Sequence, residues 1–259
     1  MTVRDLPGFR AHDLPGGDQP AGVPEARDWY AITNKGDKTA TVRIYDAIGG
    51  WLGTSAADFA QELADLDVDT IDLRLNSPGG SVFDGVAIHN ALLTHRARVD
   101  VTVDGVAASI ASVIAMAGDS VTLGRGTRLM IHNPSGLVIG QARDMREIAN
   151  LLDELAKDIA GFYAARAGKD VAHWLALMDV ETWYSAQEAV DAGLADGVLG
   201  ADKAEKDTAQ DTARVFDLTA YGFRYADREH APDPGAVALK NRSDAARRRH
   251  NQRREVRST

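Results

Sequence analysis

Apolar and polar side chains change their period several times along the middle of the chain, and each period predicts a type of element. A two-residue alternation, typical of half-buried strands, occurs in three segments: residues 42–45, 70–75 and 99–103. Apolar residues at helical spacing lie between these segments, over residues 55–66 and 86–93. The order strand, helix, strand, helix, strand predicts an α/β domain built from βαβ units.

The pattern further along predicts a buried helix, two short strands and a long helix. Residues 107–117 are apolar on all sides and too long for a strand, so we expect a buried helix there. Short strands are expected at residues 121–123 and 129–131. Residues 142–166 repeat apolar side chains at helical spacing for about seven turns, which predicts an amphipathic helix in need of a partner surface. A shorter helix ends near Gly193.

Composition divides the chain into four parts. Residues 1–28 hold four of the eight prolines and are expected to form a flexible leader. Residues 29–199 are the folded domain. Residues 200–239 are expected to form a linker with a short apolar segment around Val215 to Tyr225, and residues 240–259 a basic, disordered tail.

Charge and cysteine content exclude several classes of protein. The net charge is -9, yet residues 240–259 carry about +6, which leaves about -15 on the rest of the chain. An acidic body disfavours nucleic-acid binding except through the tail. The absence of cysteine excludes thiol nucleophiles and zinc-thiolate sites and fits a reducing compartment. No secretory signal or membrane-spanning run is visible, so we expect a soluble, cytoplasmic protein.

A serine follows the third predicted strand, in Gly105-Val106-Ala107-Ala108-Ser109. Its hydroxyl stands at the start of the predicted apolar helix, where serine is a common helix cap. The alternative is a nucleophile whose developing charge is stabilised by the helix N-terminus and neighbouring amides. Taken alone, the residue favours capping.

The segment Asn76-Ser77-Pro78-Gly79-Gly80 connects a strand to a helix. Its glycines free the backbone to direct N–H groups outward, so it is either an anion-binding cradle or a plain turn. It matches neither the Walker phosphate loop nor the three-glycine dinucleotide fingerprint. Nucleotide chemistry therefore loses support.

One of the seven histidines lies in Met130-Ile131-His132-Asn133-Pro134, at the end of a short strand that the proline terminates. An imidazole in this place can face a cleft and act as a general base. The other histidines are interpreted as structural or solvated, and no pair has metal-ligand spacing, so no metal is expected. Asp179 or Glu181, just before the last short helix, could orient His132.

Four segments occur in an order that resembles the proteolytic subunit of Clp protease and, more closely, the related head maturation proteases of tailed phages. The resemblance covers about residues 40–199 and implies a ClpP/crotonase-like α/β fold, a spiral of βαβ units with the helix at about 142–166 projecting from it. The segments are Asn76–Gly80, Gly105–Ser109, Met130–Pro134 and Ser185–Asp196.

The resemblance implies that Ser109 is the nucleophile, that His132 is the base, and that the amides of Gly80 and Ile110 form an oxyanion hole. An ungapped alignment from Ser185 places Glu181 where the family has its catalytic aspartate. We therefore expect Glu181 as the third member of the triad. The alternative is Asp179, which would need a two-residue shift. Phage members often carry Glu-Thr-Trp at this point.

The implied activity is that of a serine endopeptidase without metal or cofactor, which processes capsid or scaffold precursors during phage head maturation. Crotonase-like enzymes share the fold but do not need Ser109 and His132 together. Two alternatives stay open: an inactive structural assembly protein, and a housekeeping Clp subunit that works with an AAA+ unfoldase. The resemblance also implies a homo-oligomer, with a ring expected, in the host cytoplasm or procapsid and without a membrane partner.

Overall fold

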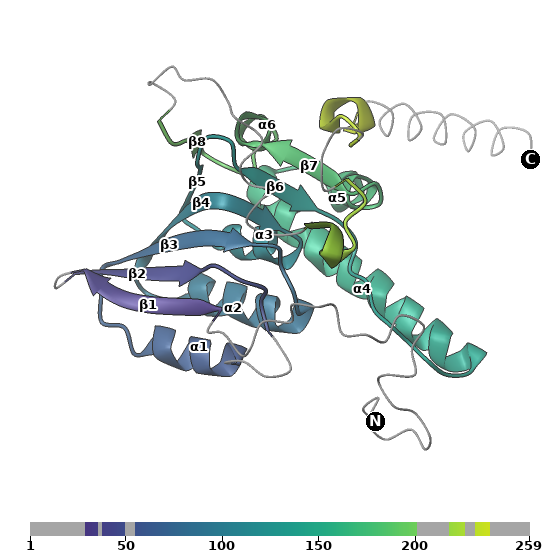
Figure 1. Ribbon diagram of the computed structural model, residues 1–259, viewed down its shortest axis with the longest axis horizontal. Coiled ribbons are helices and arrows are strands. Elements are labelled where there is room, and N and C mark those ends of the chain that lie inside the picture. The colour runs from purple at the N-terminus through teal and green to yellow at the C-terminus, as the bar shows by residue number, and fades with distance from the viewer. Residues whose placement is uncertain (1–28, 36–37, 50–54, 201–217, 226–230, 239–259) are drawn as a thin grey trace, which may run out of the picture.

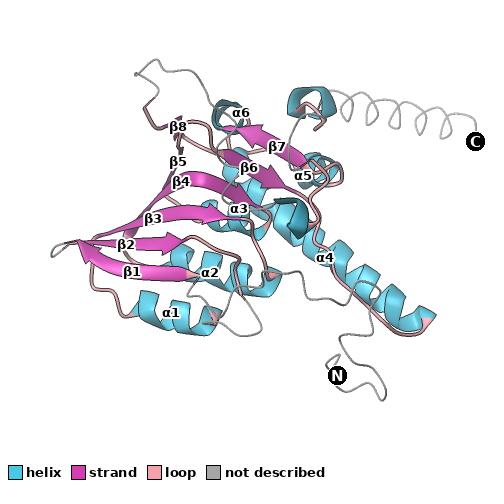
Figure 2. Ribbon diagram, in the orientation of Figure 1, coloured by secondary structure: helices cyan, strands magenta, loops and turns pink. Residues whose placement is uncertain are grey.

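The computed structural model describes most of the predicted domain and two short segments after it. The described residues are 29–35, 38–49, 55–200, 218–225 and 231–238. The expected leader at residues 1–28, the basic tail at residues 240–259 and most of the linker lie outside the described residues. The described part of the domain combines a single sheet with helices, as the hydrophobic pattern predicts (Figures 1 and 2).

The strands of the described residues form one mixed sheet. Their bounds are β1 Tyr30–Lys35, β2 Thr39–Ile44, β3 Thr70–Ser77, β4 Arg98–Ala108, β5 Ser120–Leu123, β6 Arg128–Ile131, β7 Thr182–Ser185 and β8 Gly197–Val198. Strands β2, β3 and β4 run parallel, whereas β1 pairs antiparallel with β2 and β7 antiparallel with β6.

Strand β4 is long enough to serve two neighbours along one edge. Its first half, Asp100 to Val103, pairs in parallel with β5, and β5 continues the sheet to β8. Its second half, Val106 to Ala108, pairs in parallel with β6. The sheet therefore branches at β4, and the branch that contains β6 and β7 carries the sequence motifs at residues 105–109 and 130–134.

Helices flank the sheet, and α4 extends past it in Figures 1 and 2. Their bounds are α1 Ala56–Ala64, α2 Val82–Thr94, α3 Ile110–Ala115, α4 Ala142–Ala167, α5 Val171–Met178 and α6 Ala186–Asp191, followed by a 3₁₀ turn, η4, at Leu218–Tyr221. Ser55 and Ser185 form capping boxes with the residues three positions on, which satisfies the first amides of α1 and α6.

One face of the parallel strands forms the main core. In β3 every second side chain is buried, and Ile71, Leu73 and Leu75 pack with residues of α1 and α2. The opposite face carries Asp72 and Arg74 and is only half buried. This alternation is the two-residue period from which the strand was predicted.

The prediction of a helix over residues 107–117 is wrong at its start. Strand β4 continues to Ala108, and the helix covers only Ile110 to Ala115. Val106, Ala107 and Ala108 are buried on both faces of the sheet, so they need the same uniformly apolar residues as a buried helix. The predicted long helix is confirmed, since α4 covers residues 142–167.

Candidate active site

The branch of the sheet at β4 and β6 brings Ser109 and His132 together. The two strands pair in parallel up to Ala108 and Met130, and the Ser109 amide donates to the Met130 carbonyl oxygen at 3.0 Å. Each residue therefore leaves its strand at the same end of the sheet. The His132 Nε2 atom lies 2.8 Å from the Ser109 Oγ atom, a hydrogen-bond distance.

Ser109 adopts a backbone conformation that is unusual for a residue with a side chain, with φ 54° and ψ -129°. Its hydroxyl makes no capping hydrogen bond to α3, so the interpretation as a helix cap is wrong. Conformations of this type cost about 1–3 kcal/mol and concentrate at functional sites. In the described part of the chain, Glu181 is the one other non-glycine residue with positive φ, also 54°.

A buried hydrogen-bond chain supports the strained backbone from behind. The Ser112 hydroxyl donates to the Ser109 carbonyl oxygen at 2.5 Å and lies 2.8 Å from the Tyr163 hydroxyl on α4. Ser112 and Tyr163 are almost fully buried. These hydrogen bonds connect helix α4 to the backbone of Ser109, and the conformation of that backbone sets the direction of the Ser109 side chain.

The glycine turn packs directly against Ser109. A Cβ atom added to Gly79, whose φ is 97°, would lie 2.7 Å from the Ser109 Cβ atom. Gly80 forms a parallel bridge with Ile48, in which the Gly79 carbonyl and the Ser81 amide make the hydrogen bonds and the Gly80 amide is not used. The Ile110 amide opens the first turn of α3, where amides lack a partner within the helix. The turn therefore fits the anion-cradle interpretation better than that of a plain turn.

His132 is largely removed from solvent. Burial lowers the pKa of its imidazole below the ordinary value, the negative charge of Glu181 opposes this shift, and the positive charge of Arg224 adds to it. A lowered pKa keeps the imidazole neutral, and therefore able to accept a proton, further toward acid pH.

The two candidate carboxylates have different partners. Asp179 lies at the end of α5 and accepts a hydrogen bond from the Asn133 side-chain amide at 2.6 Å. Glu181 is 5% exposed, and its negative charge raises the pKa of His132. Within the described residues neither carboxylate is hydrogen bonded to the imidazole, so the sequence expectation of a direct orienting bond is not seen in this structure.

Sequence reasoning missed a contribution from the expected linker. Phe223 lies edge-on to the His132 ring, with ring centroids 5.4 Å apart. The backbone amides of Arg224 and Tyr225 donate to the Glu181 carboxylate, each at 2.8 Å. The apolar segment around Val215 to Tyr225 was visible as a pattern, but nothing in the sequence assigned it to His132 and Glu181.

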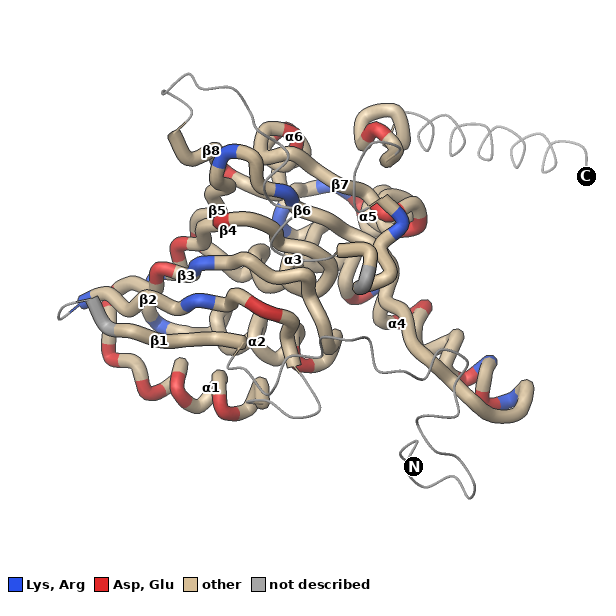
Figure 3. The backbone as a smooth tube through the Cα atoms, viewed as in Figure 1, with Lys and Arg blue, Asp and Glu red and all other residues tan. Residues whose placement is uncertain are grey.

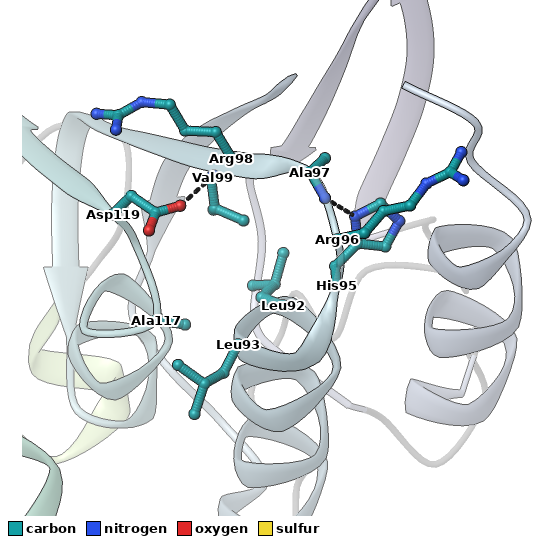
Figure 4. Close-up of a pocket in the computed structure, with 9 residues that line it drawn as sticks. All are labelled: Leu92, Leu93, His95, Arg96, Ala97, Arg98, Val99, Ala117 and Asp119. Atoms are coloured by element: carbon teal, nitrogen blue, oxygen red, sulfur yellow. Dashed lines mark hydrogen bonds between the residues drawn. The ribbon is translucent and has the colours of Figure 1, made fainter. Parts of the chain in front are cut away.

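One pocket of the described residues lies away from this group. A pocket of about 330 Å³ lies at the C-terminal end of α2, lined by Leu92, Val99 and Asp119 among others (Figure 4). Gly80 lies next to the N-terminal end of the same helix. Because 13 residues of α-helix span about 20 Å, the pocket is separated from Gly80 by the length of α2. His95 and Asp119 in that pocket already accept backbone hydrogen bonds.

The described residues contain no group of three or more histidine, aspartate or glutamate side chains placed to hold a metal ion. Acidic positions gather along α1 and the loop that follows it (Figure 3). None of the helices in the described part is both long and apolar enough to cross a membrane.

Comparison with known proteins shows a family match. The family model described as Clp protease matches residues 25–202. The ATP-dependent Clp protease proteolytic subunit of Bacteroides fragilis is 32% identical over 160 residues, which cover 58% of this chain and 77% of the relative. Proteins of the same name are 34% identical in Porphyromonas gingivalis, over 50% of this chain and 59% of the relative, and 36% identical in Ligilactobacillus salivarius, over 50% and 66%.

The family match extends over more than half of the chain and includes all four motifs. The chain belongs to the Clp protease family and is a ClpP-type serine protease.

Proposed function

We propose that Ser109 is the nucleophile and His132 the general base of a peptide-hydrolysing centre. The observation that carries this assignment is the 2.8 Å contact between the Ser109 Oγ and His132 Nε2 atoms, made by a serine in a strained conformation. A capping serine needs neither feature, whereas a nucleophile needs an adjacent base and a fixed direction.

In the reaction, the Ser109 Oγ atom attacks the carbonyl carbon of the scissile peptide as its proton passes to His132 Nε2. The carbonyl oxygen takes up the electron pair and is held by the amides of Gly80 and Ile110, each worth about 3 kcal/mol to the transition state. The imidazolium then gives its proton to the leaving nitrogen as the C–N bond breaks. Water, activated by the same imidazole, hydrolyses the acyl-enzyme.

Glu181 is proposed as the third member of the triad, in preference to Asp179. The side chain of Glu181 is buried, and its charge acts on the imidazole of His132. Asp179 is instead engaged by Asn133, at 2.6 Å. A buried carboxylate in this place stabilises the imidazolium that forms during attack, whether or not it bonds the ring before substrate binds.

The test is covalent labelling of the full-length protein with a fluorophosphonate, followed by peptide mapping of the modified residue. Wild-type protein is expected to carry one label, on Ser109, and Ser109→Ala and His132→Ala are expected to lose it. Ser135→Ala serves as the control, because Ser135 is an exposed serine near the same loop. Labelling that persists in Ser109→Ala would exclude Ser109 as the nucleophile, and a wild-type protein that resists labelling would support the inactive structural alternative.

A homo-oligomeric ring is proposed as the working assembly. Helix α4 and the loop before it expose apolar side chains that a monomer would leave in water: Leu137, Ile139, Met145 and Leu151. Light scattering of the wild-type protein is expected to give a multimer, and the pair of changes Met145→Asp and Leu151→Asp a smaller species. A wild-type monomer at micromolar concentration would contradict the proposal.

For the biological setting we propose a proteolytic subunit that degrades proteins delivered by an ATP-dependent partner, since the relatives reported above carry that name. The second candidate is processing of phage capsid or scaffold precursors. It is favoured by Glu181-Thr182-Trp183, which resembles the phage branch.

Two experiments separate these settings. Copurification of an AAA+ partner with the Ser109→Ala protein would support the first. For the second, mass spectrometry after coexpression with a candidate phage capsid precursor would show defined trimming of that precursor by the wild-type chain but not by Ser109→Ala.

A further inference from the structure

The outer face of the sheet changes character at the end of β4. Up to Asp104 its side chains are polar and half buried, but Val106 and Ala108 on the same face are fully buried. Together with Met130 and Trp183 they form a second apolar cluster, separate from the main core. The residues that cover this cluster are Leu218 and Phe223, both less than 9% exposed.

The segment Leu218–Tyr225 is therefore seated on the catalytic end of the sheet. In Figure 1 the yellow-green 3₁₀ turn lies beside the ends of β4 and β6. The family match ends at residue 202, so this segment lies outside the part of the chain that the family model describes.

The same segment supplies most of the hydrogen-bond donors to Glu181. The Tyr225 amide and the Trp183 indole N–H donate to Oε1 at 2.8 and 3.0 Å, and the Arg224 amide donates to Oε2 at 2.8 Å. A carboxylate that is 5% exposed requires such donors, because burial without them costs several kcal/mol. These amides fix the orientation of the carboxylate relative to the imidazole.

The segment also forms a wall for the base. Phe223 meets His132 edge-on at 5.4 Å and Trp183 at 5.8 Å between ring centroids. Within the described residues, the polar and ring contacts of Phe223 and the amides of Arg224 and Tyr225 go to His132, Glu181, Trp183 and the neighbouring Tyr221. These contacts therefore involve the base and the carboxylate, and not the Ser109 hydroxyl or the amides of Gly80 and Ile110.

We propose that residues 218–225 are a positioning segment of the catalytic centre, in which the amides of Arg224 and Tyr225 hold the Glu181 carboxylate and Phe223 holds the His132 ring. This inference rests on the proposed function of Ser109, His132 and Glu181. Its consequence is that acylation of Ser109 depends on a segment that lies outside the family match.

The first test removes one backbone donor. Because the Tyr225 ring also packs against the second apolar cluster, Tyr225→Ala, which loses the ring but keeps the N–H, is measured alongside. Tyr225→Pro deletes the N–H that reaches Glu181 Oε1. We expect kcat for a peptide substrate and the rate of fluorophosphonate labelling to fall about tenfold, with KM changed by less than about twofold, since one hydrogen bond to a charged group is lost. The matched control is Ala236→Pro, which also deletes an amide that donates to a carboxylate, that of Asp233, and should leave both rates unchanged.

The second test addresses the ring of Phe223 and keeps the proposal testable if the proline variant does not fold. Phe223→Ala is expected to lower kcat about tenfold, and Phe223→Leu, which refills the apolar seat, to recover part of the loss with KM again unchanged. Circular dichroism and thermal melting of each variant separate loss of fold from loss of rate.

The outcomes distinguish this inference from the proposed function. If wild-type protein labels at Ser109 and the Tyr225→Pro and Phe223 variants label at the same rate or faster, the positioning role is overturned; a faster rate would mean that the segment inhibits the centre. If wild-type protein does not label at Ser109 at all, the proposed function fails, and the inference fails with it.

Discussion

The pair Ser109 and His132 and the carboxylate of Glu181 are held in place by different means. The pair lies at the ends of two adjacent parallel strands, so the register of β4 with β6 fixes their approach. Glu181 lies in a turn between α5 and β7, and two of its three hydrogen-bond donors come from amides 43 and 44 residues further along the chain. The approach of Ser109 and His132 can be inferred from motif order. Glu181 was expected from its alignment, but the distant segment that holds its carboxylate could not be inferred from the sequence.

The largest loss of activity is expected when Glu181 itself is changed. Glu181→Gln places an NH₂ group where one oxygen now accepts a backbone amide, so donors face each other in a buried site. We expect kcat to fall by about 10⁴-fold, the order seen when a triad carboxylate is neutralised. Asp179→Asn is the matched control and should change kcat less than about threefold in steady-state peptide hydrolysis. Equal effects of the two changes would contradict the preference for Glu181, and a larger loss in Asp179→Asn would reverse the assignment.

A second change tests the packing of the glycine turn against Ser109, the proposed nucleophile. Gly79→Ala adds a Cβ atom 2.7 Å from that of Ser109, at a φ of 97° where side chains are strained. We expect a loss of about 10²-fold in kcat/KM, because displacements near 1 Å at a reacting atom have effects of this size. Gly161→Ala, on α4 with open space around the added atom, is the control. Wild-type rates in Gly79→Ala would show that the turn yields without moving Ser109.

A smaller effect is expected from the hydrogen-bond chain behind Ser109. Tyr163→Phe leaves the Ser112 hydroxyl with one partner fewer in a buried place and should lower the free energy of unfolding by about 1 kcal/mol. The rate of labelling at Ser109 should fall only a few-fold, because Ser112 keeps its bond to the Ser109 carbonyl oxygen. Urea denaturation and labelling kinetics on the same samples check both values. A rate loss as large as that of Gly79→Ala would contradict the expectation that Ser112 alone holds the Ser109 carbonyl oxygen in place.

The smallest effect is a shift of pH dependence with a defined sign. Arg224 lowers the pKa of His132, so Arg224→Ala should raise that pKa and move the acid limb of the kcat/KM profile to higher pH. The charge of Glu181 raises the same pKa, so in Glu181→Gln the residual activity should have its acid limb at lower pH. Shifts in the same direction for both variants would exclude His132 as the group observed.

Sequence reasoning was most successful where one pattern matched one environment. The strands at residues 70–75 and 129–131 and the helix of residues 142–166 had clear periods, and all are present. The four ordered motifs also identified Ser109 and His132, and these residues do meet. Parallel strands carry the residues at their carboxyl ends to one edge of a sheet, which makes such a meeting predictable.

It failed where two environments require the same residues. The end of β4 is buried on both faces and was interpreted as part of a helix. Val106 and Ala108 continue the face of Asp104 but are apolar, a change that signals a covering element without naming it. The segment of residues 218–225 is that element, and its contacts with Glu181 come from backbone amides, which leave no signature in the side-chain pattern.

The division of β4 between two neighbours makes the length of one dipeptide a functional quantity. Asp104 and Gly105 separate the half that pairs with β5 from the half that pairs with β6. A Cβ atom at Gly105 would lie 2.3 Å from the Asn76 side-chain oxygen, which leaves little room for a wider connection. Insertion of a single residue here would preserve the β5 pairing but turn Ser109 toward the opposite side of the sheet. The number of residues between these two pairings therefore determines on which side of the sheet the Ser109 hydroxyl lies.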